Sequence, residues 1–305
     1  MRSITRCTFS IVAADPGAGE VGCAVQSRYF AVGSVVPWAK AGVGAVATQA
    51  AGVAAYGPKV LALLEDGLDP SAALERALAD DSGRESRQLG VVTADGRAAA
   101  HTGTECLAWA GHRVGEGYAV QGNILAGEAV VDDMERAFRE ARGSSLAERL
   151  VSALEAAQAA GGDARGQQSS AIVVERDGAA EETREGIDRV CELRVDDHPE
   201  PIAELRRLLG IHLLWDALRR ASFFHEPGQY AQGVEVLRAA LGRHGEDPVL
   251  LYDLACFESL AGDTEGAIAH VTRSLELDPR LRPGAAADGD FEALRQDPRF
   301  RTAVS

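Results

Sequence analysis

Thr8-Phe-Ser-Ile-Val-Ala-Ala-Asp15 and the nearby Val21-Gly-Cys-Ala-Val-Gln-Ser27 decide the fold, because both segments are typical of β-strands. Asp15-Pro-Gly-Ala-Gly19 lies between them and has strong turn chemistry. The glycines of this turn, together with Gly22, match the pattern G-x-G-x-x-G. A dinucleotide-binding fingerprint needs a helix after its glycines, whereas a strand follows here, so we predict a β-hairpin.

Blocks of strands and blocks of helices alternate after this hairpin. The pattern predicts further strands at 42–50, 88–93, 97–102, 106–112, 118–123, 169–175 and 191–195. It predicts helices at 57–66, 71–80, 128–141, 145–160 and 200–220. Separate blocks of this kind favour an α+β layered fold over a Rossmann-type parallel sheet. Two antiparallel sheets stacked between helical layers would accommodate the order.

The last third of the chain has a different, repetitive pattern. The segment 233–241 matches the segment 267–275 at an offset of 34 residues. A 34-residue period of helix pairs is the signature of tetratricopeptide repeats. Fewer than two full repeats are present, so we expect this tail to pack on the main domain or on a second subunit. We therefore predict a first domain over 1–220 and a tetratricopeptide-like helical region over 221–305, with 221–229 as the linker.

The composition is that of a soluble globular protein with an excess of acidic residues. The chain has 305 residues and a formal net charge of -15, which argues against nucleic acid and anionic membrane surfaces as partners. Its five cysteines are scattered without a CxxC pair, which predicts reduced thiols and a cytoplasmic location. No signal peptide or long apolar run is found, so no membrane association is expected.

Six separated blocks of the chain resemble, in order, the domain-of-unknown-function 1028 family. The first is Thr8-Phe-Ser-Ile-Val-Ala-Ala-Asp-Pro16, and the others are 22–37, 41–49, 121–127, 161–169 and 194–199. The resemblance covers about residues 8–215. This family resembles the N-terminal-nucleophile hydrolases, whose fold is a four-layer αββα sandwich. The resemblance implies hydrolysis of an amide bond in a small molecule or short peptide, with no metal and no organic cofactor.

The resemblance places the nucleophile at Thr8. In family members this threonine follows the initiator methionine, whereas residues 1–7 precede it here. Three explanations remain open: a misplaced start codon, although no second methionine lies before Thr8; a short propeptide that is cut autocatalytically; or an unprocessed chain with an inert threonine. Cys7 is an alternative nucleophile if cleavage occurs one residue earlier, because thiolates are better nucleophiles.

The remaining candidate site residues are polar residues at strand ends. The free α-amine of Thr8 would take the hydroxyl proton, and Asn123 would stabilise the oxyanion by about 3–4 kcal/mol. Arg28, or Ser27 beside it, would orient the amine or lower its pKa. The candidates for substrate binding are Ser27, Gln49, Gln168 and Ser169.

Each candidate also has a structural interpretation. Thr8 can be an ordinary strand residue, Asn123 a cap before Ile124, and Arg28 a solvated ion-pair residue. The segment Asp196-Asp-His-Pro199 invites a metal or triad interpretation, but Asp197 can simply cap the helix that follows. His101 and His112 lie on predicted strands without a third ligand, so we interpret them as ordinary strand residues.

Two classes of function are therefore open. The first is an N-terminal-threonine amidohydrolase or peptidase that acts on a small amide, a cyclic amide or a short peptide. The second is a non-catalytic sandwich that serves as a binding module, with the helical tail contacting a protein partner or a second copy in a homo-oligomer. The polar residues gathered at strand ends favour the first class.

Overall fold

The computed structural model of the chain describes residues 8–182 and 186–305. The chain divides into two compact units, a first that ends at Leu209 and a second that runs from Gly210 to Ser305. The division falls inside helix α6 (Pro201–Ser222). Residues 1–7, the possible propeptide, lie outside the described residues. Within the described residues, no helix is both long and apolar enough to cross a membrane.

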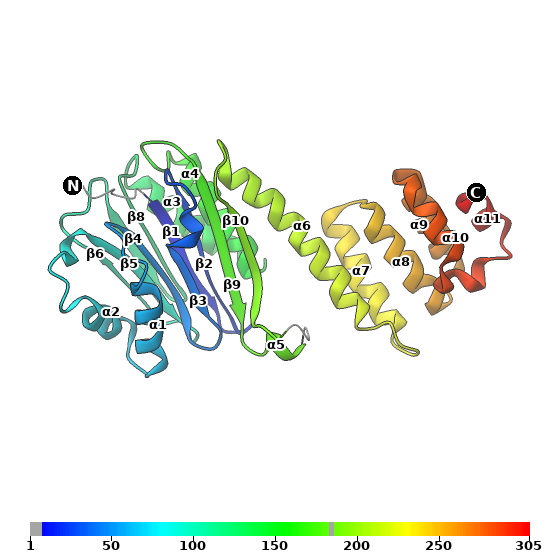
Figure 1. Cartoon of the computed structure of the whole chain (residues 1–305), viewed down its shortest axis with the longest axis horizontal. Helices are drawn as coiled ribbons and strands as arrows, with labels where there is room; N and C mark the ends of the chain where they lie inside the picture. Colours follow the sequence, from blue (N-terminus) through cyan, green and yellow to red (C-terminus); the bar gives the residue numbers. More distant parts are fainter. Residues whose placement is uncertain (1–7, 183–185) are drawn as a thin grey trace. The chain divides into compact units, whose positions relative to one another are not determined.

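The first unit is built on two antiparallel sheets (Figure 1). The six-stranded sheet has the order β10-β9-β2-β1-β8-β7 and consists of β1 (Thr8–Asp15), β2 (Glu20–Ser27), β7 (Gly111–Gly115), β8 (Tyr118–Asn123), β9 (Ser169–Arg176) and β10 (Arg189–Val195). The four-stranded sheet has the order β3-β4-β5-β6 and consists of β3 (Pro37–Lys40), β4 (Gly44–Ala50), β5 (Arg87–Thr93) and β6 (Ala98–Thr102). The predicted mixed architecture with antiparallel sheets is confirmed.

Small apolar side chains fill the space between the two sheets. Val12 and Val25 of the six-stranded sheet belong to the same buried cluster as Ala47 and Val92 of the four-stranded sheet. Because side chains alternate along a strand, the neighbours of these residues face the helices instead. The dense run of Gly, Ala and Val at 42–50 thus places small side chains where two sheets approach each other.

Helices cover the outer faces of both sheets. Helices α1 (Tyr56–Glu65) and α2 (Pro70–Leu78) pack on the four-stranded sheet through a second buried cluster. Helices α3 (Ala129–Glu140) and α4 (Leu146–Ala159) lie on the six-stranded sheet, where α4 contacts β1 and β2 (Figure 1). Gly22 permits this close approach, because a Cβ there would lie 2.9 Å from Leu150 Cδ1. A short helix, α5 (Ala179–Glu182), follows β9.

Two strands differ from the sequence-based expectation. The strand predicted over 106–112 is wrong in position, because β7 covers Gly111–Gly115. The main-chain oxygens of Leu107 and Trp109 instead accept hydrogen bonds from the N–H groups of Ile124 and Leu125. Strand β3 was not predicted, and it is a short edge strand that begins with a proline and pairs only with β4.

The second unit is entirely helical (Figure 1). After the end of α6 it contains α7 (Tyr230–His244), α8 (Pro248–Ala261), α9 (Thr264–Leu277), α10 (Arg282–Ala287) and α11 (Pro298–Val304). Asp247 and Asp263 cap α8 and α9 by accepting main-chain N–H groups of their first turns. Helices α7 and α9 begin 34 residues apart, which matches the offset between the two similar sequence segments. The predicted helical C-terminal region is confirmed.

Candidate functional site

Neighbouring strands of the six-stranded sheet bring polar residues into one row. Thr8 begins β1 and pairs with Ser27 at the end of β2 and with Asn123 at the end of β8. Ser27 pairs in turn with Ser169 at the start of β9. Thr8 shares a strand face with Val12, which lies in the core between the sheets, so the Thr8 side chain also faces the second sheet. Its hydroxyl donates a hydrogen bond to Ser27 Oγ at 3.2 Å.

The four-stranded sheet contributes two glutamines, Gln49 and Gln88, which form hydrogen bonds with residues of this row. Gln49 on β4 pairs with Gln88 on β5, and Gln49 Nε2 donates to Gln88 Oε1 at 2.9 Å. Asn123 Nδ2 donates to the same oxygen at 3.0 Å. Gln49 Nε2 also lies 3.3 Å from the main-chain oxygen of Thr8. Gln88 Nε2 donates to the main-chain oxygen of Gly122 at 2.8 Å, so the Gln88 amide is held in one orientation.

Ser10 and Gln121 extend the network, and the sequence analysis missed both of them together with Gln88. Ser10 Oγ donates to Gln49 Oε1 at 2.7 Å, and Gln121 Nε2 donates to Ser10 Oγ at 2.7 Å. Gly90 leaves room for Gln121, because a Cβ at residue 90 would lie 2.1 Å from Gln121 Oε1. The available signal was the recurrence of polar residues at alternate positions in strands of small apolar residues.

Seven side chains thus form what we call the inter-sheet polar cluster: Thr8, Ser10, Ser27, Gln49, Gln88, Gln121 and Asn123. All seven are fully buried. The cluster holds hydroxyl and amide groups but no ionisable side chain, so a hydroxyl that reacts here needs a base from outside the seven. Among residues 8–182 and 186–305, no group of three or more His, Cys, Asp or Glu residues is arranged to hold a metal ion.

A histidine lies at the edge of the cluster. Thr102 Oγ1 accepts a hydrogen bond from Gln88 Nε2 at 3.0 Å and lies 2.8 Å from His112 Nδ1. The Thr102 hydroxyl donates to Nδ1 when this nitrogen is unprotonated and accepts from it when it is protonated. Burial, together with the nearby Arg113 guanidinium, lowers the pKa of His112, which favours the neutral imidazole.

Two residues that follow cluster members have unusual backbone conformations. Ala50, directly after Gln49, has a φ of 65°, and Ile124, directly after Asn123, has a φ of 52°. Positive φ is uncommon for residues other than glycine and costs of order 1 kcal/mol or more per residue. Backbone strain of this kind gathers at functional sites, which makes this end of the two sheets a candidate site.

The other predicted site residues lie beside the cluster. Arg28 is exposed, and its guanidinium donates to the main-chain oxygen of Arg165 at 3.5 Å. Ser169 is buried, and its Oγ accepts from the main-chain N–H of Val32 at 3.1 Å, which ties down the loop after β2. Gln168 is half-buried, and its Nε2 donates to Asp197 Oδ1 at 3.1 Å. The structure therefore brings Thr8, Ser27, Gln49 and Asn123 into one network and places Arg28, Gln168 and Ser169 at its border.

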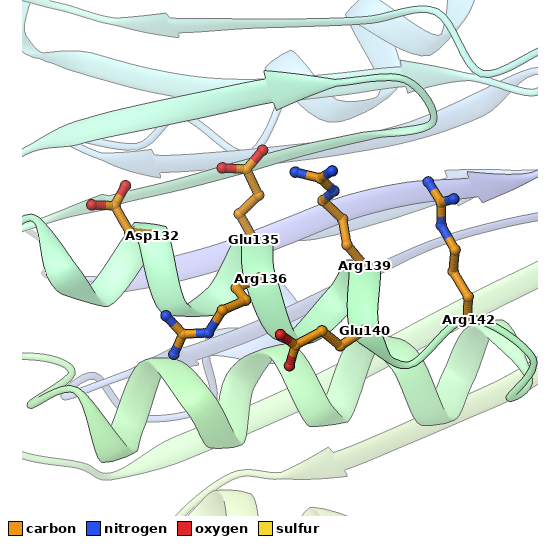
Figure 2. Close-up of a pocket in the computed structure, with 6 residues that line it drawn as sticks. All are labelled: Asp132, Glu135, Arg136, Arg139, Glu140 and Arg142. Atoms are coloured by element: carbon orange, nitrogen blue, oxygen red, sulfur yellow. The ribbon is translucent and has the colours of Figure 1, made fainter.

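A surface hollow of about 420 Å³ lies elsewhere on the first unit, along α3. Its lining is entirely charged and comprises Asp132, Glu135, Arg136, Arg139, Glu140 and Arg142. Figure 2 shows Glu135, Arg139 and Arg142 pointing to one side of α3. The Tyr118 hydroxyl donates a hydrogen bond to Glu135 Oε1 at 2.5 Å. Tyr118 is the first residue of β8, and Asn123 is the last residue of the same strand. The hollow therefore adjoins the opposite end of β8 from the inter-sheet polar cluster.

Comparison with known proteins places the chain in a family. Residues 8–205 match the model of DUF1028, which is described as a family of unknown function. The chain belongs to this family. The crystal structure of a DUF1028 protein from Silicibacter pomeroyi is similar to it, with 34% identity and a TM-score of 0.60 over 67% of this chain and 88% of that chain. No curated protein matches the chain.

The DUF1028 match includes every residue of the inter-sheet polar cluster and ends at residue 205. Helices α7 to α11 therefore lie outside it. The family resemblance inferred from the six sequence blocks is confirmed.

Proposed function

We propose that the first unit of this DUF1028 protein hydrolyses amide bonds, and that Thr8 is its nucleophile once residues 1–7 have been removed. The observation that carries the proposal is the position of Thr8 at the head of β1, inside a cluster of hydroxyls and amides that contains no base. An N-terminal threonine supplies its own base, since a free α-amine has a reference pKa of about 7.7–8.0. The substrate class is a small amide or a short peptide.

The layer order of the unit supports the proposal. Two facing antiparallel sheets with helices on both outer faces resemble the αββα sandwich of N-terminal-nucleophile hydrolases (Figure 1). The strained residues Ala50 and Ile124 support it as well, because they follow cluster members at the same end of the sheets.

The proposed reaction proceeds through an acyl-enzyme. The α-amine of Thr8 takes the hydroxyl proton while Oγ attacks the amide carbonyl, and the ammonium then passes this proton to the departing amine. Water hydrolyses the resulting ester and restores the hydroxyl. The side-chain amide of Asn123, which lies opposite Thr8 on β8, is our candidate donor to the oxyanion. Ser27, 3.2 Å from the Thr8 oxygen, orients the hydroxyl.

The burial of Thr8 favours a second candidate function. Thr8 has no exposed surface in the intact chain, so catalysis requires that the processed chain exposes its oxygen. If residues 1–7 stay attached, Thr8 has no α-amine and the cluster can only stabilise the sheets. The first unit would then be a non-catalytic binding module.

Intact-mass analysis of the purified protein separates the two candidates. The hydrolase proposal expects a mature chain that begins at Thr8, with processing lost in Thr8→Ala and retained in Thr8→Ser. Thr48→Ala is a matched control, because Thr48 is also a buried strand threonine but donates its hydroxyl to Val53 at 3.2 Å. A β-lactone probe should then acylate the mature wild-type chain and leave Thr8→Ala unmodified.

The hydrolase proposal is refuted if the chain begins at Met1 or Arg2 under every condition. It is also refuted if the Thr8→Ala variant reacts with the probe as well as the mature wild-type chain does. We further propose that α7 to α9 form a tetratricopeptide-like binding region, on the basis of the 34-residue spacing of α7 and α9, and that the protein is cytoplasmic.

A further inference from the structure

Three charged side chains line one side of the hollow along α3. Glu135, Arg139 and Arg142 point in the same direction, whereas Arg136 and Glu140 point to the other side of the helix (Figure 2). With a rise of 1.5 Å per residue, successive members of the group of three are about 4.5–6 Å apart along the helix axis. We call these three residues the α3 trio, and a small ligand can contact all of them at once.

The two arginines of the α3 trio are exposed and keep their capacity to bind an acid. Within the part of the chain that the structure describes, neither guanidinium forms an ion pair, whereas Arg136 pairs with Asp133 at 2.7 Å. The negative end of the α3 dipole favours cations at Arg139 and Arg142, but it amounts to about half an elementary charge. Most of their positive charge is therefore available to a carboxylate, which guanidinium groups bind through two parallel hydrogen bonds.

Glu135 is held by a tyrosine instead of by the arginine one turn later. Its Oε1 accepts from the Tyr118 hydroxyl at 2.5 Å, and in the described residues its Oε2 has no hydrogen-bond partner. Glutamate and arginine at this spacing commonly pair on a helix, so Tyr118 keeps Glu135 and Arg139 apart. Burial and the bond to Glu135 raise the pKa of Tyr118 to about 12, while the charges of Arg139 and Arg142 oppose this rise. Both guanidiniums therefore lie near the Tyr118 hydroxyl.

The signs of the three charges select a ligand that carries both signs. Glu135 repels a simple anion, and the two guanidiniums repel a simple amine. An acidic amino acid has one ammonium and two carboxylates within a few ångströms of one another, so each group of the ligand can meet an opposite charge. Its single net negative charge also balances the single net positive charge of the α3 trio. Asp132, another acid of the hollow, is already paired with Arg113 at 2.8 Å.

We propose that the hollow along α3 binds a free acidic amino acid, with its ammonium at Glu135 and its carboxylates at Arg139 and Arg142. The volume of about 420 Å³ suits a small molecule. The chain's net charge of -15 repels anions in general, so an acidic ligand needs a local arrangement of this kind. Because exposed ion pairs are individually weak, the dissociation constant should be about 0.1–10 mM. Tyr118 and Thr8 lie at opposite ends of their paired strands, so this binding does not depend on the proposed hydrolysis.

Saturation-transfer difference NMR on the full chain tests the proposal with L-glutamate and L-aspartate over about 0.1–20 mM. We expect saturable binding that Arg139→Ala, Arg142→Ala and Glu135→Gln each weaken about threefold or more. N-acetyl-glutamate, which lacks the ammonium, and glutamine, which lacks one carboxylate, should bind more weakly than glutamate. Arg136→Ala and Glu140→Gln are matched controls that should leave binding unchanged, because both residues line the hollow but point to the other side of α3.

Circular dichroism of each variant verifies that the helices are intact. The proposal is overturned if neither amino acid binds saturably, or if the two control variants weaken binding as much as the variants of the α3 trio. Stronger binding after Glu135→Gln, or equal binding of N-acetyl-glutamate and glutamate, would reject an amino acid in favour of a simple anion. Displacement of glutamate by acetate or inorganic phosphate at equal concentration would reject it as well.

Discussion

Replacing Gln88 by leucine should destabilise the first unit strongly, because this one amide connects both sheets. Its Oε1 accepts from Gln49 and Asn123 at 2.9 and 3.0 Å. Its Nε2 donates to Thr102 Oγ1 at 3.0 Å, and to the main-chain oxygens of Gly122 at 2.8 Å and Gly111 at 3.2 Å. Leucine has a similar volume but no polar atom, so all of these contacts are lost while the space stays filled.

The expected magnitude follows from the groups that lose a partner. A buried donor or acceptor left without a hydrogen bond costs about 1–3 kcal/mol. Gln49 Nε2 keeps only long contacts, at 3.3 Å to Thr8 O and 3.4 Å to Gln121 O, and its side chain is fully buried. With two or three groups affected, Gln88→Leu should lower the free energy of unfolding by about 3–6 kcal/mol, a large share of the total stability of a domain.

Urea unfolding, followed by circular dichroism and tryptophan fluorescence, measures this loss. The two units require a fit that allows a separate transition for each. Gln168→Leu is the matched control, since Gln168 is half-buried and makes one hydrogen bond to Asp197 at 3.1 Å; it should cost about 1 kcal/mol or less. A loss below about 1 kcal/mol for Gln88→Leu, or one equal to that of the control, would refute the reasoning.

A double-mutant cycle with Gln49→Leu tests whether the two glutamines act together. Both single variants lose the bond between Gln49 Nε2 and Gln88 Oε1, so the double variant should be less destabilised than the sum of the singles by about 0.5–3 kcal/mol. Strict additivity would show that the two side chains do not form one network.

Two histidines should give the two units opposite responses to pH. Burial lowers the pKa of His112 below 6.5, so the unfolded first unit binds a proton more readily than the folded unit. The free energy of unfolding of the first unit should therefore fall as pH drops below about 6.5. His112→Asn should remove this pH dependence. The hydrogen bond to Glu258 raises the pKa of His270 above 6.5. The stability that protonated His270 adds to the second unit should therefore be complete below pH 6.5 and be lost as pH rises through the raised pKa. His270→Asn should remove this pH dependence. Urea unfolding between pH 5 and 8 measures both, and slopes of equal sign that persist in both variants would contradict these assignments.

Local sequence patterns were sufficient for most of the secondary structure. The first hairpin was predictable because strand and turn signals lie within 20 neighbouring residues, and its register pairs Thr8 with Ser27. The helices α3 and α4 were predictable for the same reason, since helical periodicity is a property of one segment. The strand predicted over 106–112 failed because the main-chain groups of Leu107 and Trp109 bond to residues 124 and 125 rather than to a neighbouring strand.

The residues of the candidate site also fall into those that the sequence could indicate and those that it could not. Thr8, Ser27, Gln49 and Asn123 could be selected because each is polar and ends or begins a strand that the sequence itself indicates. Gln88 begins the strand predicted over 88–93 and meets the same criterion, although it was missed. Ser10 and Gln121 lie inside their strands, and alternation along a strand shows that two faces exist without showing which face is enclosed. Only the stacking of the two sheets turns these three side chains toward the others.

The sequence by itself determined the family, the alternating blocks of strands and helices, and the place of Thr8 at the start of the first strand, because these depend on residues close together in the chain. Tertiary structure alone decided that Gln49 and Asn123 both donate hydrogen bonds to Gln88 Oε1, and that Thr8 is enclosed beside them. The physical reason is that strands β1, β4, β5 and β8 are far apart in sequence. Their side chains meet only when two sheets close over a core that excludes water.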